Sequence, residues 1–310
     1  MRRLVFFGLA VALAMTLTAC DWPMFGYDLG HSRSSPDPAL TTGNVRTLTT
    51  KWTGTTAGPV QSSPAVVKGV VYVGSAGGSM HAFNATTGAS LWTAGSSSPV
   101  NSSPAVVDGV VYVGANNDRV YAFDATSGAT LWSALTGGEV FSSPAVANGT
   151  VFVGSSDGHL YAFDATTGAR VWSATTRGFV ESSPAVVDGT VYVGSGDGNL
   201  YAFDAAGVTN CSETLKTCSP LWSASTGGEV LSPAVVDGIA YVGSTNGNVF
   251  AFDAKTGETL WTSTATASGG PSSPAMLWTA TTAMYVLSSP AVANGMVYVG
   301  SDKVYAFGLT

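Results

Sequence analysis

Short runs of β-branched and aromatic residues alternate along the chain with turns rich in glycine, aspartate and asparagine. Residues 110–114 and 160–164 are two such runs, and Asp-Gly or Asn-Gly pairs such as Asp157-Gly158 lie between neighbouring runs. These dipeptides favour tight hairpins because both central residues tolerate positive φ. The apolar positions do not follow the 3.6-residue period of an amphipathic helix. The pattern therefore predicts many short antiparallel strands.

These strands belong to a repeat of about 40 residues. The pattern Ala-x-Asp/Asn-x-x-Ser/Thr-Gly-x-x-x-Trp runs over residues 82–92, 122–132, 162–172 and 251–261. A fixed period of this length indicates a repeat architecture, and four strands per repeat correspond to one propeller blade. We interpret the tryptophan and glycine of the pattern as structural, since an indole can supply the large apolar contact between blades. The docking tryptophans are Trp92, Trp132, Trp172, Trp222 and Trp261.

The spacing of the prolines that open each blade gives the number of blades. They stand at Pro64, Pro104, Pro144, Pro184, Pro233, Pro274 and Pro290. Five whole blades are expected over residues 62–97, 102–137, 142–177, 182–226 and 232–266. The sixth is expected to combine strands from 288–308 with an N-terminal strand at 48–53, a 3+1 closure that leaves no free sheet edge. Residues 272–287 then form a truncated blade remnant inserted as a hairpin, with a distorted seven-bladed ring as the alternative.

The N-terminus has the features of an export signal. Arg2 and Arg3 precede an apolar stretch over residues 4–17, which is too short to span a bilayer. Residues 17–20, Leu-Thr-Ala-Cys, resemble the lipobox of bacterial lipoproteins, in which the cysteine is lipidated. We therefore expect a signal peptide at 1–20 with lipidation at Cys20, an irregular lead-in at 21–47 and one propeller domain at 48–310. An ordinary cleaved signal peptide is the alternative.

Cysteine content and charge narrow the function classes. Cys211 and Cys218 remain after Cys20, and export to an oxidising compartment favours a disulfide between them. The chain has a net charge of −7 with 12 lysines and arginines, which offers no footprint for nucleic acid. Asp-Gly turns lack the regularly spaced ligands of a calcium loop. We expect no metal site.

The eleven-residue pattern resembles the tryptophan-docking motif of quinoprotein-type propellers, the PQQ-like repeat family. The resemblance covers nearly the whole mature chain, and residues 22–26, Trp-Pro-Met-Phe-Gly, look like the lead-in of such propellers. Some members of the family are dehydrogenases that hold pyrroloquinoline quinone (PQQ) and calcium over the central channel. Others bind no cofactor, such as the propeller lipoprotein of the outer-membrane assembly machine. The dehydrogenases carry adjacent cysteines, a catalytic aspartate and calcium ligands, none of which can be transferred to positions of this chain.

Positions that differ between blades are the candidates for recognition. The residue before each first strand varies, and first strands line the channel of a propeller, so these residues are expected at one mouth. The candidate mouth residues are Gln61, Asn101, Phe141, Arg177 and Glu181. PQQ is a tricarboxylate that needs several cationic partners, whereas only Arg177 is available near this mouth. A solvated surface pair is the simpler interpretation of Arg177 and Glu181.

These observations predict a non-catalytic, lipid-anchored and monomeric propeller that binds an unidentified protein or polymer partner in the bacterial envelope. No cofactor is expected and no catalytic residue can be assigned. The alternative function is a PQQ-dependent quinoprotein dehydrogenase, or a degenerate remnant of one, with PQQ and calcium as cofactors.

Overall fold

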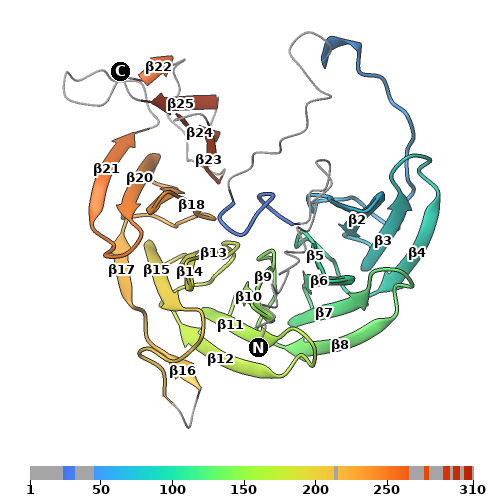
Figure 1. The fold of residues 1–310 in the computed structure, drawn as a ribbon, viewed down its shortest axis with the longest axis horizontal. Helices are drawn as coiled ribbons and strands as arrows, with labels where there is room; N and C mark the ends of the chain where they lie inside the picture. The colour runs from blue at the N-terminus through green and yellow to red at the C-terminus, as the bar shows by residue number, and fades with distance from the viewer. Residues whose placement is uncertain are drawn as a thin grey trace, which may run out of the picture.

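Six four-stranded antiparallel blades follow one another in an arc in the computed structural model, which describes residues 24–31, 45–212, 216–264, 276–278, 289–293, 296–300 and 304–308 (Figure 1). The first three blades contain β1 (Ala65–Val67), β2 (Val70–Ser75), β3 (Ser79–Asn84) and β4 (Ser90–Gly95); β5 (Ala105–Val107), β6 (Val110–Ala115), β7 (Arg119–Asp124) and β8 (Thr130–Leu135); and β9 (Ala145–Ala147), β10 (Thr150–Gly154), β11 (His159–Asp164) and β12 (Arg170–Thr175). The prediction of a β-propeller with four-stranded antiparallel blades is confirmed.

The other three blades complete the arc. They contain β13 (Ala185–Val187), β14 (Thr190–Gly194), β15 (Asn199–Asp204) and β17 (Trp222–Ser225); β18 (Ala234–Val236), β19 (Ile239–Gly243), β20 (Asn248–Asp253) and β21 (Thr259–Thr264); and β23 (Ala291–Ala293), β24 (Met296–Gly300), β25 (Val304–Gly308) and β22 (Met276–Trp278). A short 3-10 helix, η1 (Val45–Thr47), lies outside the blades, and the two-residue strand β16 (Thr217–Cys218) adds a fifth, parallel strand to the outer edge of the third blade. Among the described residues, no helix is long and apolar enough to cross a bilayer.

The middle strands of the first five blades are buried on both faces, which explains their continuous apolar sequence. In β10, the four residues from Val151 to Gly154 are all buried. Stacking of one blade on the next covers both faces of each sheet, so the strands need no polar alternation. For example, the side chains of Phe152 and Leu160 belong to one hydrophobic cluster that joins the third and fourth blades.

The repeated eleven-residue pattern forms the contact between blades. Trp132, on β8 of the second blade, donates from its indole Nε1 to the carbonyl of Ala165 on the third blade at 2.9 Å. Gly168 lies beneath that ring at φ +71°, and a Cβ there would come within 2.7 Å of the indole. Asp164 closes the same turn, because its Oδ1 accepts from the backbone N–H groups of Thr166 and Thr167 at 3.1 and 2.8 Å.

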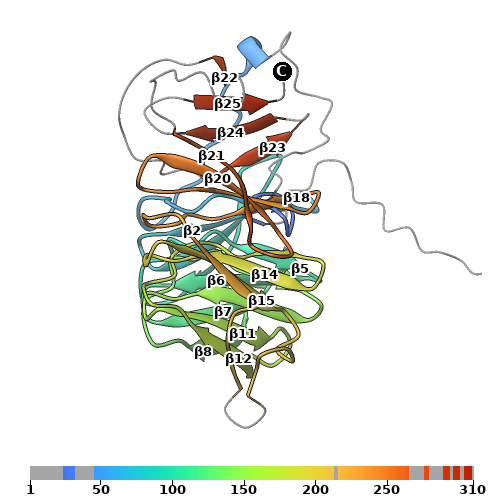
Figure 2. The ribbon, with the colours of Figure 1, turned by 90° about the vertical axis from the view of Figure 1, so that its left-hand side faces the viewer.

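The closure of the sixth blade differs from the prediction. Its outer strand is β22, in which Trp278 pairs with Ala306 of β25, and residues 48–53 lie in no strand. The expected 3+1 closure by the N-terminal segment is therefore wrong in this structure, since a strand from the predicted remnant at 272–287 takes the place. The rest of that remnant lies outside the described residues. Figure 2 shows the sixth blade beyond the fifth, at the end of the arc.

Candidate functional site

The first strand of each blade lies innermost and faces the centre of the arc (Figure 1). Neighbouring inner strands are linked by the serine that precedes each proline. The backbone N–H of Ser103 donates to Ser143 Oγ at 3.0 Å, and that of Ser143 donates to Ser183 Oγ at 3.0 Å. The same link joins Ser63 to Ser103 and Ser183 to Ser232. The sequence pattern gives the blade-opening prolines but not this role of the serines before them, because a link between blades has no local signature.

The lead-in occupies the centre of the arc. Inner strands β13 and β18 donate to it, from Val186 N–H to the carbonyl of Leu29 at 2.7 Å and from Val235 N–H to that of Gly30 at 2.8 Å. Met24 is buried against the second and third blades. His31 is 2% exposed, and its Nδ1 lies 2.9 Å from the carbonyl oxygen of Pro233. Residues 24–31 therefore fill part of the channel that the inner strands would otherwise leave open.

The candidate mouth residues each precede an inner strand, at the end of the channel where the blades connect. Gln61, Arg177 and Glu181 are exposed, whereas Asn101 and Phe141 are half-buried. Arg177 and Glu181 both lie in the described part of the chain, and no ion pair joins them. The sequence interpretation of Arg177 and Glu181 as a surface pair thus has no contact to support it.

Glu181 instead belongs to a group of carboxylates. Although the Glu181 side chain is exposed, neighbouring protein atoms partly desolvate its carboxylate and raise its pKa, and the negative charges of Glu229 and Glu139 raise it further. Burial also raises the pKa of Glu229. We call Glu139, Glu181 and Glu229 the acidic mouth. The sequence analysis missed Glu139 and Glu229, although both lie in the pentapeptide Thr-Gly-Gly-Glu-Val that occurs at residues 136–140 and 226–230.

Arg177 and Phe179 stand on the connection between the third and fourth blades. The Arg177 backbone N–H donates to Asp197 Oδ2 at 2.9 Å, and the Tyr201 hydroxyl donates to the same oxygen at 2.7 Å. Burial and this bond to Asp197 raise the pKa of Tyr201 to about 12. Phe179 is 39% exposed. This part of the mouth therefore presents one apolar ring and one cation beside the carboxylates.

The donor groups at the mouth do not fit PQQ. A tricarboxylate needs several cationic or hydrogen-bonding groups around it. The described mouth offers the Arg177 guanidinium, whereas Glu139, Glu181 and Glu229 would repel an anion. Nor do the described residues hold three histidine, cysteine or acidic side chains in an arrangement for a metal.

One serine and one histidine are in contact, but they are placed for structure. Ser75 Oγ lies 3.2 Å from His81 Nε2, and His81 Nδ1 lies 3.1 Å from Thr93 Oγ1. Ser75 is fully buried, and burial lowers the pKa of His81. A nucleophile needs access to substrate, so this pair offers no reaction site.

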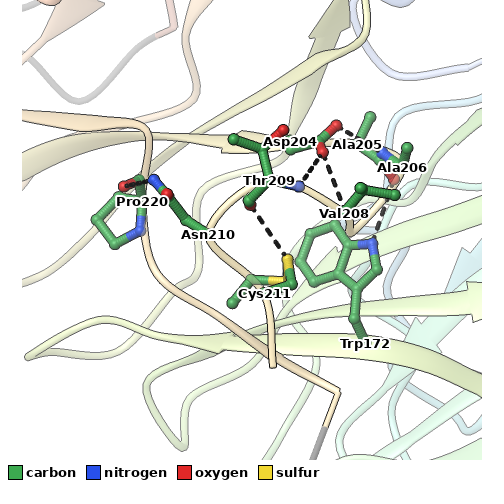
Figure 3. The surroundings of a disulfide bond; sticks show 10 residues. Trp172, Asp204, Ala205, Ala206, Val208, Thr209, Asn210, Cys211 and Pro220 are labelled. Atoms are coloured by element: carbon green, nitrogen blue, oxygen red, sulfur yellow. Dashed lines mark hydrogen bonds between the residues drawn. A yellow bond between two sulfur atoms is a disulfide. The ribbon is translucent and has the colours of Figure 1, made fainter. Parts of the chain in front are cut away.

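Cys211 and Cys218 form a disulfide at the base of the insertion in the fourth blade (Figure 3). The insertion reaches back to the third blade, where β16 pairs in parallel with the outer strand β12. Ser173 N–H donates to the carbonyl of Lys216 at 2.9 Å. Trp172, the docking tryptophan of β12, is 1% exposed beneath this insertion. The disulfide thus holds a strand that covers one outer edge of the propeller.

Comparisons with known proteins agree with this architecture. The family model described as outer membrane protein assembly factor BamB matches residues 40–143, 118–210 and 214–307. The structure of BamB from Moraxella catarrhalis is 23% identical with a TM-score of 0.64, covering 81% of this chain and 74% of that one. Quinohemoprotein alcohol dehydrogenase from Comamonas testosteroni is 19% identical with a TM-score of 0.68, covering 90% of this chain and 57% of its own. A search of curated protein sequences gives no significant match.

Proposed function

The chain belongs to the family described as outer membrane protein assembly factor BamB, and on that premise we propose that it is a non-catalytic scaffold of the bacterial envelope. The proposal includes export by the signal peptide at 1–20 and a lipid anchor on Cys20. The partner is an envelope protein or polymer that binds at the acidic mouth.

The observation that carries this proposal is that a channel filled by the chain itself opens at a mouth lined with carboxylates. Residues 24–31 bond to two inner strands, so the centre is occupied by the chain itself. The mouth has three carboxylates, and the pKa of Glu181 is raised first by partial desolvation and then by repulsion from Glu229 and Glu139. A basic segment of a partner would relieve that repulsion, and the exposed ring of Phe179 offers it an apolar contact.

The PQQ-dependent dehydrogenase remains the second candidate because quinohemoprotein alcohol dehydrogenase has a similar fold. Similarity at 19% identity concerns the fold alone, since one fold supports many functions. The residues at the mouth argue against it. Calorimetric titration with PQQ and calcium, with a dye-reduction assay alongside, tests it directly: binding at micromolar concentration or below would overturn the scaffold proposal.

A photo-crosslinking residue placed at Phe179 tests the scaffold itself. In the envelope of the producing cell, we expect a discrete adduct with one partner from position 179, and none from the exposed Leu131 on the outer edge of β8. The yield of the adduct should fall with rising salt, because salt screens the attraction between opposite charges at an exposed surface. It should also fall with Glu181→Lys, because the new lysine would repel a basic partner. Equal adducts from both positions, or no response to Glu181→Lys, would contradict binding at the acidic mouth.

A further inference from the structure

The first blade has an uncovered face. Val60 is 45% exposed, whereas the equivalent residues Val100, Val140 and Val180, each 40 residues further on, are fully buried. Val100 is buried because it packs on Gly74 of the preceding blade. Its Cγ1 would lie only 2.5 Å from a Cβ at position 74. Ser63 is likewise exposed, although Ser103 and Ser143 are buried. The first blade therefore lacks the preceding blade that buries the equivalent valine in the second, third and fourth blades.

The segment before the first blade already follows the path of an outer strand from such a neighbour. Trp52 Nε1 donates to the carbonyl of Ala85 at 2.9 Å, as Trp92 does to that of Ala125 at the same distance. The carbonyl of Pro59 accepts from Ala76 N–H at 2.8 Å. The corresponding bond 40 residues later joins Asn116 N–H to the carbonyl of Pro99.

The sixth blade supplies the other half of this arrangement. In each complete blade, the docking tryptophan pairs with the alanine of its own third strand, such as Trp92 with Ala82. In the sixth blade Trp278 of β22 pairs with Ala306 in this register. Trp52 thus makes the contact with the next blade, and Trp278 makes the pairing within the blade. One tryptophan does both in the first four blades.

We propose that residues 48–53 and β22 exchange at the outer edge of β25. With β22 on that edge, the propeller is open between its sixth and first blades. With residues 48–53 on it, Trp52 pairs with Ala306, Val60 packs on Gly300 and the ring closes. β22 is the internal competitor that holds the ring open.

Two disulfide pairs that share one cysteine test the exchange in the full chain, with Cys20 replaced by serine. Met276 lies opposite Phe307 in the open form. The register of the first blade, in which Ser90 lies opposite Phe83, places Thr50 opposite Phe307 in the closed form. Under mild oxidation, both M276C/F307C and T50C/F307C should form an intramolecular disulfide. Absence of the T50C/F307C bond, or its formation only between two chains, overturns the proposal.

Thiol labelling gives a second readout that introduces no cysteine into the sixth blade. V60C should react with a maleimide at least tenfold faster than V100C, whose position is fully buried. Deletion of residues 276–278 should slow the labelling of V60C at least tenfold, because residues 48–53 then hold the ring closed. V60C labelling that is unchanged by this deletion overturns the proposal.

Discussion

The indole of Trp132 bonds the carbonyl of Ala165 at 2.9 Å, and the two residues lie 33 positions apart on different blades. The same bond joins Trp92 to Ala125 and Trp222 to Ala254. The sequence repeat is thus a repeat of contacts between blades. Stability in such an array should depend on each junction, since a blade contacts mainly its neighbours.

Gly168→Ala should destabilise the protein more than Gly149→Ala. Both glycines have positive φ, +71° and +72°, so both substitutions cost about 1 kcal/mol of backbone strain. Only at 168 would the new Cβ meet an indole, that of Trp132, whereas nothing lies within 4 Å at 149. We expect an additional loss of about 1–3 kcal/mol for Gly168→Ala, as for overpacking elsewhere. Urea unfolding of both variants measures it, and equal losses would show that the indole contact adds nothing.

Ser143→Ala tests the link between inner strands. The substitution removes the acceptor for the buried N–H of Ser103, and an unsatisfied buried donor costs about 1–3 kcal/mol. Ser63→Ala is the matched control, because the Ser63 side chain is exposed on the uncovered face of the first blade. We expect this control to unfold within about 0.5 kcal/mol of the parent chain. A similar loss for both variants would contradict a special role for the buried serines.

Local chemistry made much of the fold predictable. Asp164 and Gly168 define a turn whose geometry depends on neighbours in sequence, so its eleven-residue pattern could be recognised directly. The placement of residues 24–31 in the channel depends on bonds to Val186 and Val235, which lie far away in the chain. The acidic mouth was missed for the same reason, since Glu139 and Glu229 lie 90 residues apart. The closure of the sixth blade was mispredicted because residues 48–53 and β22 each carry a tryptophan, Trp52 and Trp278, that suits the same edge of β25.

The aspartates of the docking turns should govern stability in acid. Hydrogen bonds from Thr167 lower the pKa of Asp164, and equivalent bonds lower those of Asp124 and Asp253. A carboxyl whose folded pKa is depressed contributes stability above its unfolded pKa, near 4, and loses it as the pH falls through the folded value. The triple variant D124N/D164N/D253N keeps an acceptor oxygen, as Asn84 does in the first blade. The urea midpoint of the variant should therefore fall less than that of the parent between pH 4 and pH 2.5. An equal fall in the two proteins would contradict this role of the aspartates.

The acidic mouth should have the opposite dependence on pH. Partial desolvation and the charges of Glu229 and Glu139 raise the pKa of Glu181, so the folded chain binds this proton more tightly than the unfolded chain does. Stability is then lost as the pH rises through the unfolded pKa, near 4.3, towards the raised folded value. E181Q/E229Q should raise the melting temperature at pH 7 by a small amount, on the order of 1 °C because Glu181 is exposed to screening solvent, with no gain at pH 4. Glu258→Gln, at an exposed position on the fifth blade, is the control. An equal gain from this control, or a gain that persists at pH 4, would show that the mouth carboxylates do not repel one another in the folded protein.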